Sequence, residues 1–313
     1  MIFPDAFLPY LEPAVDFPTF LIQLLNGVQY GLLLFLIASG LTLIFGIMGI
    51  INLAHGSFYM LGAYLAFSLT EGLGSLWLAL PAGIVLSVLF GLALEWLVIQ
   101  RLYARDHLYQ VLLTYGLILV FEELRSILWG DDVHGVKVPE LLAASISLTD
   151  NLNYPVYRLA MSGVCLVLAL GLWWVLRRTK LGMIIRAGSV NRDMVQSLGI
   201  DITLIYRIVF AAGLALAAFA GMLAAPTSSV FPGMGNQVLI ICFVVVVIGG
   251  IGSVQGAMIG AILIGLVDTF GKVLTLEVAG FQLLPQLSGV TVYLMMAVIL
   301  LWRPEGLFGS RGR

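Results

Sequence analysis

The 313-residue chain alternates long apolar runs with short polar breaks. A run of about 20 apolar residues is long enough to cross the hydrocarbon core of a bilayer as a helix. The pattern predicts helical spans near residues 19–47, 53–70, 76–100, 108–129, 156–176, 203–225, 235–250, 254–271 and 284–302. We therefore expect one all-α integral membrane domain over residues 1–313, a multi-span bundle of about 8–10 transmembrane helices.

Composition agrees with that expectation and excludes several classes of function. Hydrophobic residues make up 61% of the chain and charged residues only 10%, whereas soluble domains carry about 25% charged residues. The sequence lacks a phosphate-binding GxxxxGK[ST] loop, an HExxH or GxSxG motif and paired cysteine ligands. We expect no enzyme activity, no ATP binding by this chain, no cofactor and no metal. The net charge of -2 gives no reason to expect a nucleic-acid partner.

Basic residues predict the topology, because cytoplasmic segments carry the excess of lysine and arginine. They follow the third, fifth and last spans, at Arg101 and Arg105, in segment 177–201, and at Arg303, Arg311 and Arg313. These segments share one side only if residues 235–271 cross twice, so that run is divided at Gly249–Gly252. The acidic, proline-rich tail 1–18 and the acidic loop 130–155 are then outside, and the tail 303–313 is cytoplasmic.

The basic segment 177–201 also contains an apolar stripe with helical spacing, formed by Met183, Ile184, Ala187, Val190, Met194 and Leu198. We expect one short amphipathic helix over 183–198, stopped by Gly199, with Asp201 or Thr203 capping the next helix. A loop that only fixes the topology would explain the charge equally well. An ordered apolar stripe needs something to pack against, which favours a docking helix for a soluble partner.

Asn52 and His55 lie between two apolar runs, among several glycines that include Gly56. Polar residues beside helix-breaking glycines suggest a discontinuous helix that lines a cavity. Alternatively, His55 is a structural histidine that hydrogen-bonds a freed backbone carbonyl. The stretch 250–256 is similar to 50–56, which raises the possibility of an internal duplication, and such repeats commonly bracket a transport pathway.

Ionisable residues within membrane spans are costly and usually have a role. The candidates here are Glu95, Glu122, Glu123, Arg125 and Asp268. Glu122 and Arg125 are three residues apart and can pair on one face of a helix. Glu95 can approach the cytoplasmic interface, and Asp268 is near the outer end of its span. None of them forms a convincing proton relay.

A resemblance to a known family rests on four segments that occur together and in order. Residues 26–67, NGVQYGLLLFLIASGLTLIFGIMGIINLAHGSFYMLGAYLAF, resemble the signature of permease subunits from branched-chain amino acid ABC importers. Segments 179–200, 247–261 and the terminal 303–309, RPEGLFG, agree with it. The resemblance covers essentially the whole chain. It implies a fold like that of type II ABC importer permeases, in a bacterial inner membrane.

The same resemblance implies the partners and the functional residues. The partners are a second, homologous permease subunit, two cytoplasmic ATPase subunits, a periplasmic or extracellular solute-binding protein, a small-molecule substrate and membrane lipid. The expected ATPase-coupling residues are Ile184, Arg186, Ala187, Val190, Asn191, Met194, Leu198 and Gly199. The expected translocation-pathway residues come instead from the polar break near residue 52 and its counterpart at 250–256: Asn52, His55, Gly56, Ser57 and Gln255. Val195 stands where the family often has alanine.

The substrate is not determined by the resemblance, since selectivity in this architecture lies largely in the binding protein. A branched-chain or other small neutral amino acid is the first expectation. Urea or a small organic or aromatic acid is the alternative within the family. Outside it, an ion-coupled secondary transporter would have to use Glu122, Glu123 or Asp268, and a channel would need a polar filter that the sequence hardly offers.

Overall fold

The computed structural model describes residues 17–309 except 104, 150–151, 274–276 and 279–280. The predicted external tail therefore lies almost wholly outside the described residues, as do Arg311 and Arg313. The helices are α1 (Phe17–Met48), α2 (His55–Leu73), α3 (Leu76–Leu97), α4 (His107–Trp129), α5 (Val156–Arg178), α6 (Lys180–Val190), α7 (Arg192–Ser197), α8 (Ile202–Ser228), α9 (Met234–Gly249), α10 (Val254–Val273) and α11 (Leu283–Trp302), with short 3-10 helices at Ile99–Leu102 and Glu140–Leu142. Two antiparallel hairpins complete the fold, β1 (Ser145–Thr149) with β2 (Leu152–Pro155) and β3 (Glu277–Val278) with β4 (Phe281–Gln282).

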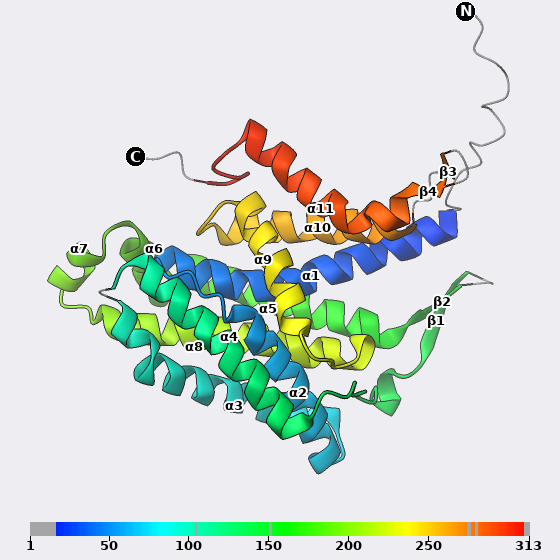
Figure 1. Ribbon diagram of the computed structural model, residues 1–313, viewed down its shortest axis with the longest axis horizontal. Coiled ribbons are helices and arrows are strands. Elements are labelled where there is room, and N and C mark those ends of the chain that lie inside the picture. The colour runs from blue at the N-terminus through cyan, green and yellow to red at the C-terminus, as the bar shows by residue number, and fades with distance from the viewer. Residues whose placement is uncertain (1–16, 104, 150–151, 274–276, 279–280, 310–313) are drawn as a thin grey trace, which may run out of the picture.

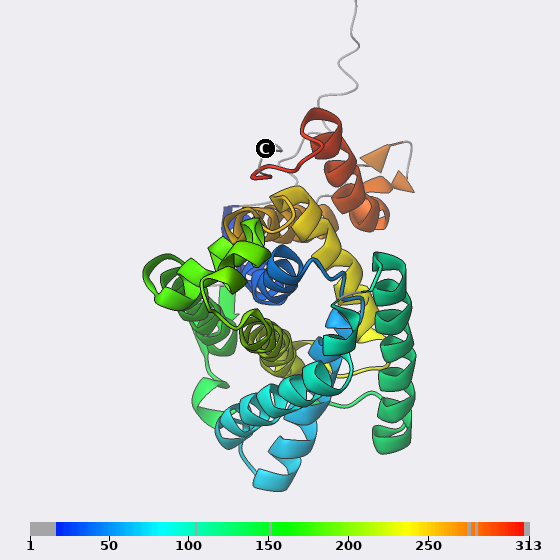
Figure 2. The same cartoon turned by 90° about the vertical axis from the view of Figure 1, so that its left-hand side faces the viewer.

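Helix α1 forms the axis of the bundle. It packs against α10, α8 and α5, and Figure 2 shows it almost end-on between these three helices. Every residue from Gly31 to Ile44 is buried. A helix that is apolar on all sides belongs in a protein core or in a bilayer, and here other helices cover the apolar run 31–44.

Close helix packing depends on glycine at a few positions. A Cβ on Gly62 of α2 would lie 2.0 Å from the backbone oxygen of Ala218 in α8. A Cβ on Gly40 of α1 would lie 2.4 Å from the backbone oxygen of Gly213 in α8. Small residues let membrane helices approach closely enough for their backbones to touch. These contacts hold α1, α2 and α8 together as the core.

The loops separate into two ends of the bundle. The α9–α10 turn meets the C-terminal segment, where the Leu307 amide donates to the Ile248 carbonyl at 2.8 Å. Tyr103, after α3, packs on Tyr206 at the start of α8, with ring centroids 5.0 Å apart. In Figure 1, α6, α7 and the segment after α11, residues 303–309, lie at the left and both β hairpins at the right. The basic segments therefore share one end of the molecule, here called the basic end.

By length and composition, five of the described helical stretches can cross a membrane: Phe17–Met48, Leu76–Leu102, Val156–Arg178, Ile202–Ser228 and Val254–Val273. The expectation of a multi-span helical membrane protein is confirmed. The predicted division of 235–271 is also correct, because α9 ends at Gly249 and α10 begins at Val254. Helix α9 has only 16 residues, which is short for a span.

Candidate functional site

The polar segment between α5 and α8 folds into two short helices, α6 and α7, at the basic end (Figure 1). The hydroxyl oxygen of Thr179 starts α6 by accepting a hydrogen bond from the Gly182 amide at 3.2 Å. Glycine is required at position 182, because a Cβ there would lie 2.2 Å from the backbone oxygen of Leu176. The chain thus turns sharply out of α5 and runs on as a surface helix.

The prediction of one continuous helix in this segment is wrong at Asn191. Its backbone is extended, with φ of -152°, and its side-chain oxygen accepts the Met194 amide at 3.0 Å. An asparagine that bonds the backbone in this way competes with continuation of the helix, so α6 ends and α7 starts anew. The predicted stop and cap are confirmed: Gly199 has φ of +80°, and the Asp201 carboxylate accepts the Thr203 amide at 2.9 Å.

The helical break leaves the apolar stripe on the surface. Val190 is 87% exposed and Leu198 is 70% exposed. We call the exposed members of the stripe the coupling face: Met183, Ala187, Val190, Met194 and Leu198. Ile184 is half-buried, and Val195, where the sequence departs from the family pattern, points inward and is 3% exposed. The departure therefore does not touch the coupling face.

Arg186 is engaged within the chain. Its guanidinium donates a hydrogen bond to the carbonyl of Leu176 in the last turn of α5, where free carbonyls attract cationic side chains. Arg186 also lines a cavity of about 250 Å³ between α1, α5, α6 and the start of α10, together with Ser189 and Gln255. We call this the inner cavity. The inner cavity therefore joins Gln255, which is expected in the pathway, to Arg186, which is expected to contact the ATPase.

Asn52 and His55 form a buried junction between α1 and α2. Both side chains are fully buried. The Nε2 atom of His55 lies 2.9 Å from the carbonyl oxygen of Ile37, and the Asn52 side-chain oxygen accepts the Ala54 amide at 3.1 Å. Within the described part of the chain, the side-chain nitrogen of Asn52 and the Nδ1 atom of His55 have no hydrogen-bond partner. The junction thus combines two hydrogen bonds with two unpaired polar nitrogens. A buried polar group without a hydrogen-bond partner destabilises the folded state.

The neighbouring pathway candidates pack tightly at the same junction. A Cβ on Gly56 would lie 2.2 Å from the backbone oxygen of Gly235 in α9, and Ser57 is 3% exposed. The structure therefore brings four of the five predicted pathway residues together as a closed contact of α1, α2 and α9. Gln255 lies apart from them, in the inner cavity.

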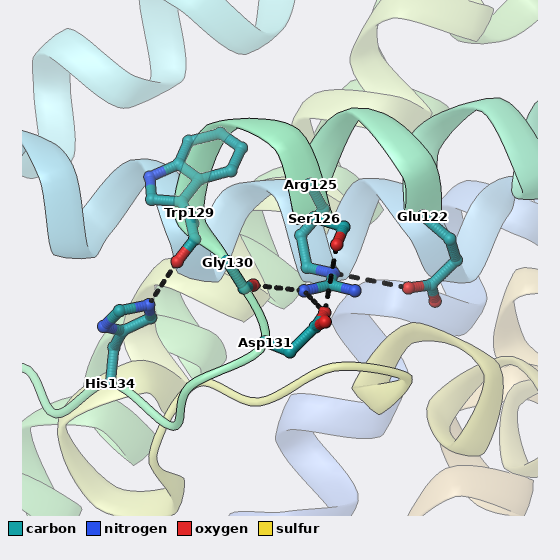
Figure 3. A network of polar contacts seen from close by, with 7 residues as sticks. All are labelled: Glu122, Arg125, Ser126, Trp129, Gly130, Asp131 and His134. Atoms are coloured by element: carbon teal, nitrogen blue, oxygen red, sulfur yellow. Dashed lines mark hydrogen bonds and ion pairs between the residues drawn. The ribbon is translucent and has the colours of Figure 1, made fainter.

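At the opposite end of the bundle, Arg125 ties α4 to the following loop (Figure 3). Its Nη1 atom lies 2.9 Å from the carboxylate of Asp131, and its Nε atom lies 3.5 Å from Glu122. The predicted Glu122–Arg125 pair is therefore present, with a third member from the loop. Hydrogen bonds from Arg125 and from Ser126 hold the pKa of Asp131 below its usual range. The loop is anchored by charge at its first residues.

His134 continues this anchoring toward α8 and α9. Its Nε2 atom lies 3.1 Å from the Trp129 carbonyl (Figure 3), and its ring stacks on Phe67 with centroids 4.3 Å apart. Its backbone exchanges two hydrogen bonds with Val230, each of 2.8 Å. The loop after α4 is thus held against α2 and the α8–α9 connection.

Sequence reasoning missed the ion pair between Glu95 and Arg207. The Glu95 carboxylate is fully buried, and Arg207 Nε of α8 lies 2.8 Å from it. Tyr103 also donates a hydrogen bond to this carboxylate. The available signal was Arg207 itself, a charge inside the apolar run 203–225, because a charge in a membrane span requires a partner.

Comparison with known proteins identifies the family. The family model described as "Branched-chain amino acid transport system / permease component" matches residues 23–300. The permease protein BraD of Pseudomonas aeruginosa, from a high-affinity branched-chain amino acid transport system, is 31% identical, over 93% of this chain and 96% of its own. LivH of Escherichia coli, from a system of the same description, is 28% identical, over 94% and 97%. No solved structure matches significantly.

A more distant relative is the ribose import permease protein RbsC of Haemophilus influenzae, 29% identical over 74% of this chain and 72% of its own. Family membership confirms that the protein is a membrane permease component and not an enzyme. Over 23–300, nearly the whole described bundle with α6, α7 and the Asn52–His55 junction, this chain belongs to the branched-chain amino acid transport system permease family.

Proposed function

We propose that this chain is the membrane-spanning subunit of an ATP-binding-cassette importer and forms half of the pathway for branched-chain or other small amino acids. The observation that supports this most directly is the coupling face on a family-matched permease. Five apolar side chains, among them Val190 at 87% exposure, are exposed in the described part of the chain. Exposed apolar patches of this kind mark interaction sites.

The partner that fits the coupling face is a cytoplasmic ATPase subunit. The face lies on the segment with the densest basic charge, at the basic end of the bundle, where lysine and arginine favour the cytoplasm. A complete importer would contain two such ATPases, a second permease related to this one and a solute-binding protein on the outer side. The loop anchored by Arg125 and His134 lies at that outer end.

The orientation follows from the same separation of charge. We place the described basic segments and the C-terminus in the cytoplasm and the N-terminus outside, in a bacterial inner membrane. Helices α1 to α5 and α8 to α11 then alternate in direction. Residues 49–54 return from the basic end to the level of Ile37 in α1, where α2 begins at His55. This arrangement requires that α9, although short, crosses the membrane once and that α10 crosses back.

The closed junction around Asn52 and His55 is the proposed barrier of the pathway. It lies where α1, α2 and α9 meet. Its polar contacts, from His55 to Ile37 and from Ala54 to Asn52, are hydrogen bonds that can exchange partners. In the transport cycle, the unused nitrogen atoms of Asn52 and His55 would meet water or solute when these helices separate. Gly56, Ser57 and Gln255 border the same route in this proposal.

Two alternatives to this function are another substrate for the same kind of complex and another mechanism of transport. Import of urea or a small organic acid would use the same complex with another binding protein, and the ribose permease shows that relatives differ in their named substrates. An ion-coupled transporter is disfavoured by the structure. Glu122 is paired with Arg125 and Asp268 with Lys272, so two of its three candidate carboxylates are already neutralised.

The test is to purify the chain in mild detergent from cells that express its neighbouring genes. We expect two ATPase subunits and a second permease to co-purify, and the complex in proteoliposomes to accumulate leucine only with ATP and a loaded binding protein. Accumulation driven by an ion gradient without ATP would overturn the proposal.

A further inference from the structure

A second, larger cavity opens at the outer end of the bundle. It has a volume of about 450 Å³ and is bounded by α1, α2, α5, α8 and α10. We call it the outer cavity. Along α1 it extends from Gln23 to Leu33, ten residues, or about 15 Å at the helical rise. It ends at Leu33 and Tyr59, each one helical turn from the contact between Ile37 and His55.

Two opposite charges from different helices face this cavity. Arg158, in the first turn of α5, donates a hydrogen bond from Nη1 to the Asn26 side-chain oxygen at 2.7 Å. Asp268 of α10 lies 2.5 Å from Lys272 Nζ. Its side chain is 12% exposed, whereas that of Lys272 is 59% exposed. The lysine can therefore swing into water and leave the carboxylate to another cation.

The rest of the wall suits a small solute with an apolar side chain. Leu33 and Ala224 contribute apolar surface, and Tyr30 contributes an aromatic ring, which lies 5.9 Å from Lys272 Nζ. Ligand sites typically combine apolar walls with a few convergent polar groups that fix orientation. The outer cavity has this composition, with the cations Arg158 and Lys272 and the anion Asp268 in its wall.

We propose that the outer cavity is a binding site for the zwitterionic head of an α-amino acid. The guanidinium of Arg158 receives the α-carboxylate, which matches its planar pair of donors, and the carboxylate of Asp268 receives the α-ammonium in place of Lys272. The side chain of the solute lies against Leu33, Ala224 and the Tyr30 ring. The proposal rests on the transport function proposed above and specifies its substrate class within this subunit.

Other substrate classes fit the cavity less well. Urea carries no charge and could not replace Lys272 as the cation beside Asp268. A simple carboxylate would meet Arg158 but has no cationic group to take the place of Lys272 beside Asp268. A sugar offers hydroxyl groups, which do not require two separated opposite charges. Only a solute with both charges matches both groups at once.

The experiment measures binding to the purified complex without its binding protein, by saturation-transfer NMR. The probes are leucine, leucine amide, which lacks the carboxylate, and 4-methylpentanoate, which lacks the ammonium. We expect each analogue to bind about tenfold more weakly than leucine, as the loss of one charge-assisted hydrogen bond predicts. Equal binding of leucine and 4-methylpentanoate would show a carboxylate site and overturn the zwitterion assignment.

Two variants test which residue binds the carboxylate and which binds the ammonium of leucine. In Arg158→Gln, leucine should bind no better than leucine amide, and in Asp268→Asn, no better than 4-methylpentanoate. Lys137→Gln removes an exposed positive charge of the outer loop and should change nothing. The analogue comparison on the unaltered complex decides the proposal even if a variant fails to fold.

The outcomes also separate this proposal from the transport function. If the complex assembles and imports leucine with ATP while both variants bind and import it normally, the outer cavity is not the site and the importer assignment stands. If no ATPase co-purifies and ATP drives no uptake, the importer assignment itself has failed.

Discussion

Arg207 of α8 and Glu95 of α3 form an ion pair with an Nε–Oε2 distance of 2.8 Å, in which the carboxylate is fully buried and the Arg207 side chain is 32% exposed. Arg207 also donates to Gln100 at 3.1 Å. The pair fastens the start of α8, which directly follows the coupling segment, to the end of α3. It is therefore placed to keep α6 and α7 in a fixed position relative to the bundle.

Arg207→Leu should destabilise the subunit, because it leaves the Glu95 carboxylate buried without its cation. We expect a loss of about 2 kcal/mol, less than for a fully buried pair because Arg207 is partly solvated. The measurement is the thermal unfolding midpoint of the detergent-solubilised complex. Glu95→Gln combined with Arg207→Leu should recover part of the loss, since no unpaired charge remains, and a double variant less stable than the single one would contradict this.

Gly62→Ala should prevent α2 and α8 from packing, since the added Cβ would lie 2.0 Å from the Ala218 backbone oxygen. A backbone atom cannot move aside as a side chain can, so we expect a cost of about 3 kcal/mol or more. The readout is the amount of monodisperse complex in size-exclusion chromatography.

The matched control is Gly116→Ala in α4, where a Cβ would meet nothing within 4 Å. Alanine favours helix over glycine by about 1 kcal/mol, so this variant should be as stable as the original protein or slightly more stable. Equal yields of both alanine variants would show that α2 and α8 can be separated without penalty.

His55→Leu should reduce uptake per assembled complex if the Asn52–His55 junction is the barrier of the pathway. The change removes the contact with Ile37 and puts a rigid apolar side chain where a polar group has to exchange partners. Uptake is measured in proteoliposomes and divided by the amount of complex that contains the ATPases. Unchanged uptake would remove His55 from the pathway, and failure to assemble would assign it a structural role.

The sequence was sufficient to predict a multi-span helical membrane protein, because a bilayer requires long apolar runs, although only five of the described helices meet the length and composition of a span. It also predicted Gly199 as a helix stop and Asp201 as a cap, since both act on adjacent residues. The break at Asn191 was missed because the helical spacing of the apolar stripe continues across it. An asparagine side chain that bonds its own backbone leaves no trace in hydrophobic periodicity.

Contacts between distant residues could not be read from the pattern. Glu95 and Arg207 are separated by 112 positions, and Asn26 and Arg158 by 132. Nothing in the local sequence indicates which buried charge meets which partner, because that depends on how the helices are arranged. The candidate pathway residues were recognised by type, yet their burial as a closed junction emerged only from packing.

Single cysteines should report the orientation of the bundle. Cys165 and Cys242 are both buried, so introduced cysteines dominate labelling by a membrane-impermeant maleimide. Ser197→Cys and Glu305→Cys, both at exposed positions, should react only after the membrane is opened. Val133→Cys, at a position that is 65% exposed, should react in intact spheroplasts. Labelling of Ser197→Cys from outside would reverse the orientation and remove the cytoplasmic partner.

Ala187→Asp tests the coupling face directly. Ala187 lies between Met183 and Val190 on the exposed side of α6, so an aspartate there puts a charge into the proposed contact with the ATPase. An unpaired charge in a buried interface costs about 3 kcal/mol or more, which is a loss of affinity of at least about a hundredfold. Membrane insertion should be normal, because the residue is exposed and outside the spans. Pull-down of the ATPase and ATP-driven uptake are the two readouts.

Arg178→Ala is the control for this variant, because Arg178 is an exposed charge at the end of α5 and is not part of the coupling face. It should keep the ATPase bound and transport at a rate close to normal. Ala187→Asp should lose the ATPase, or keep it with hydrolysis that loaded binding protein no longer stimulates. Normal transport by Ala187→Asp with the ATPases bound would mean that the coupling face makes no contact in the complex. The basic charge of the segment would then serve only to orient the chain in the membrane.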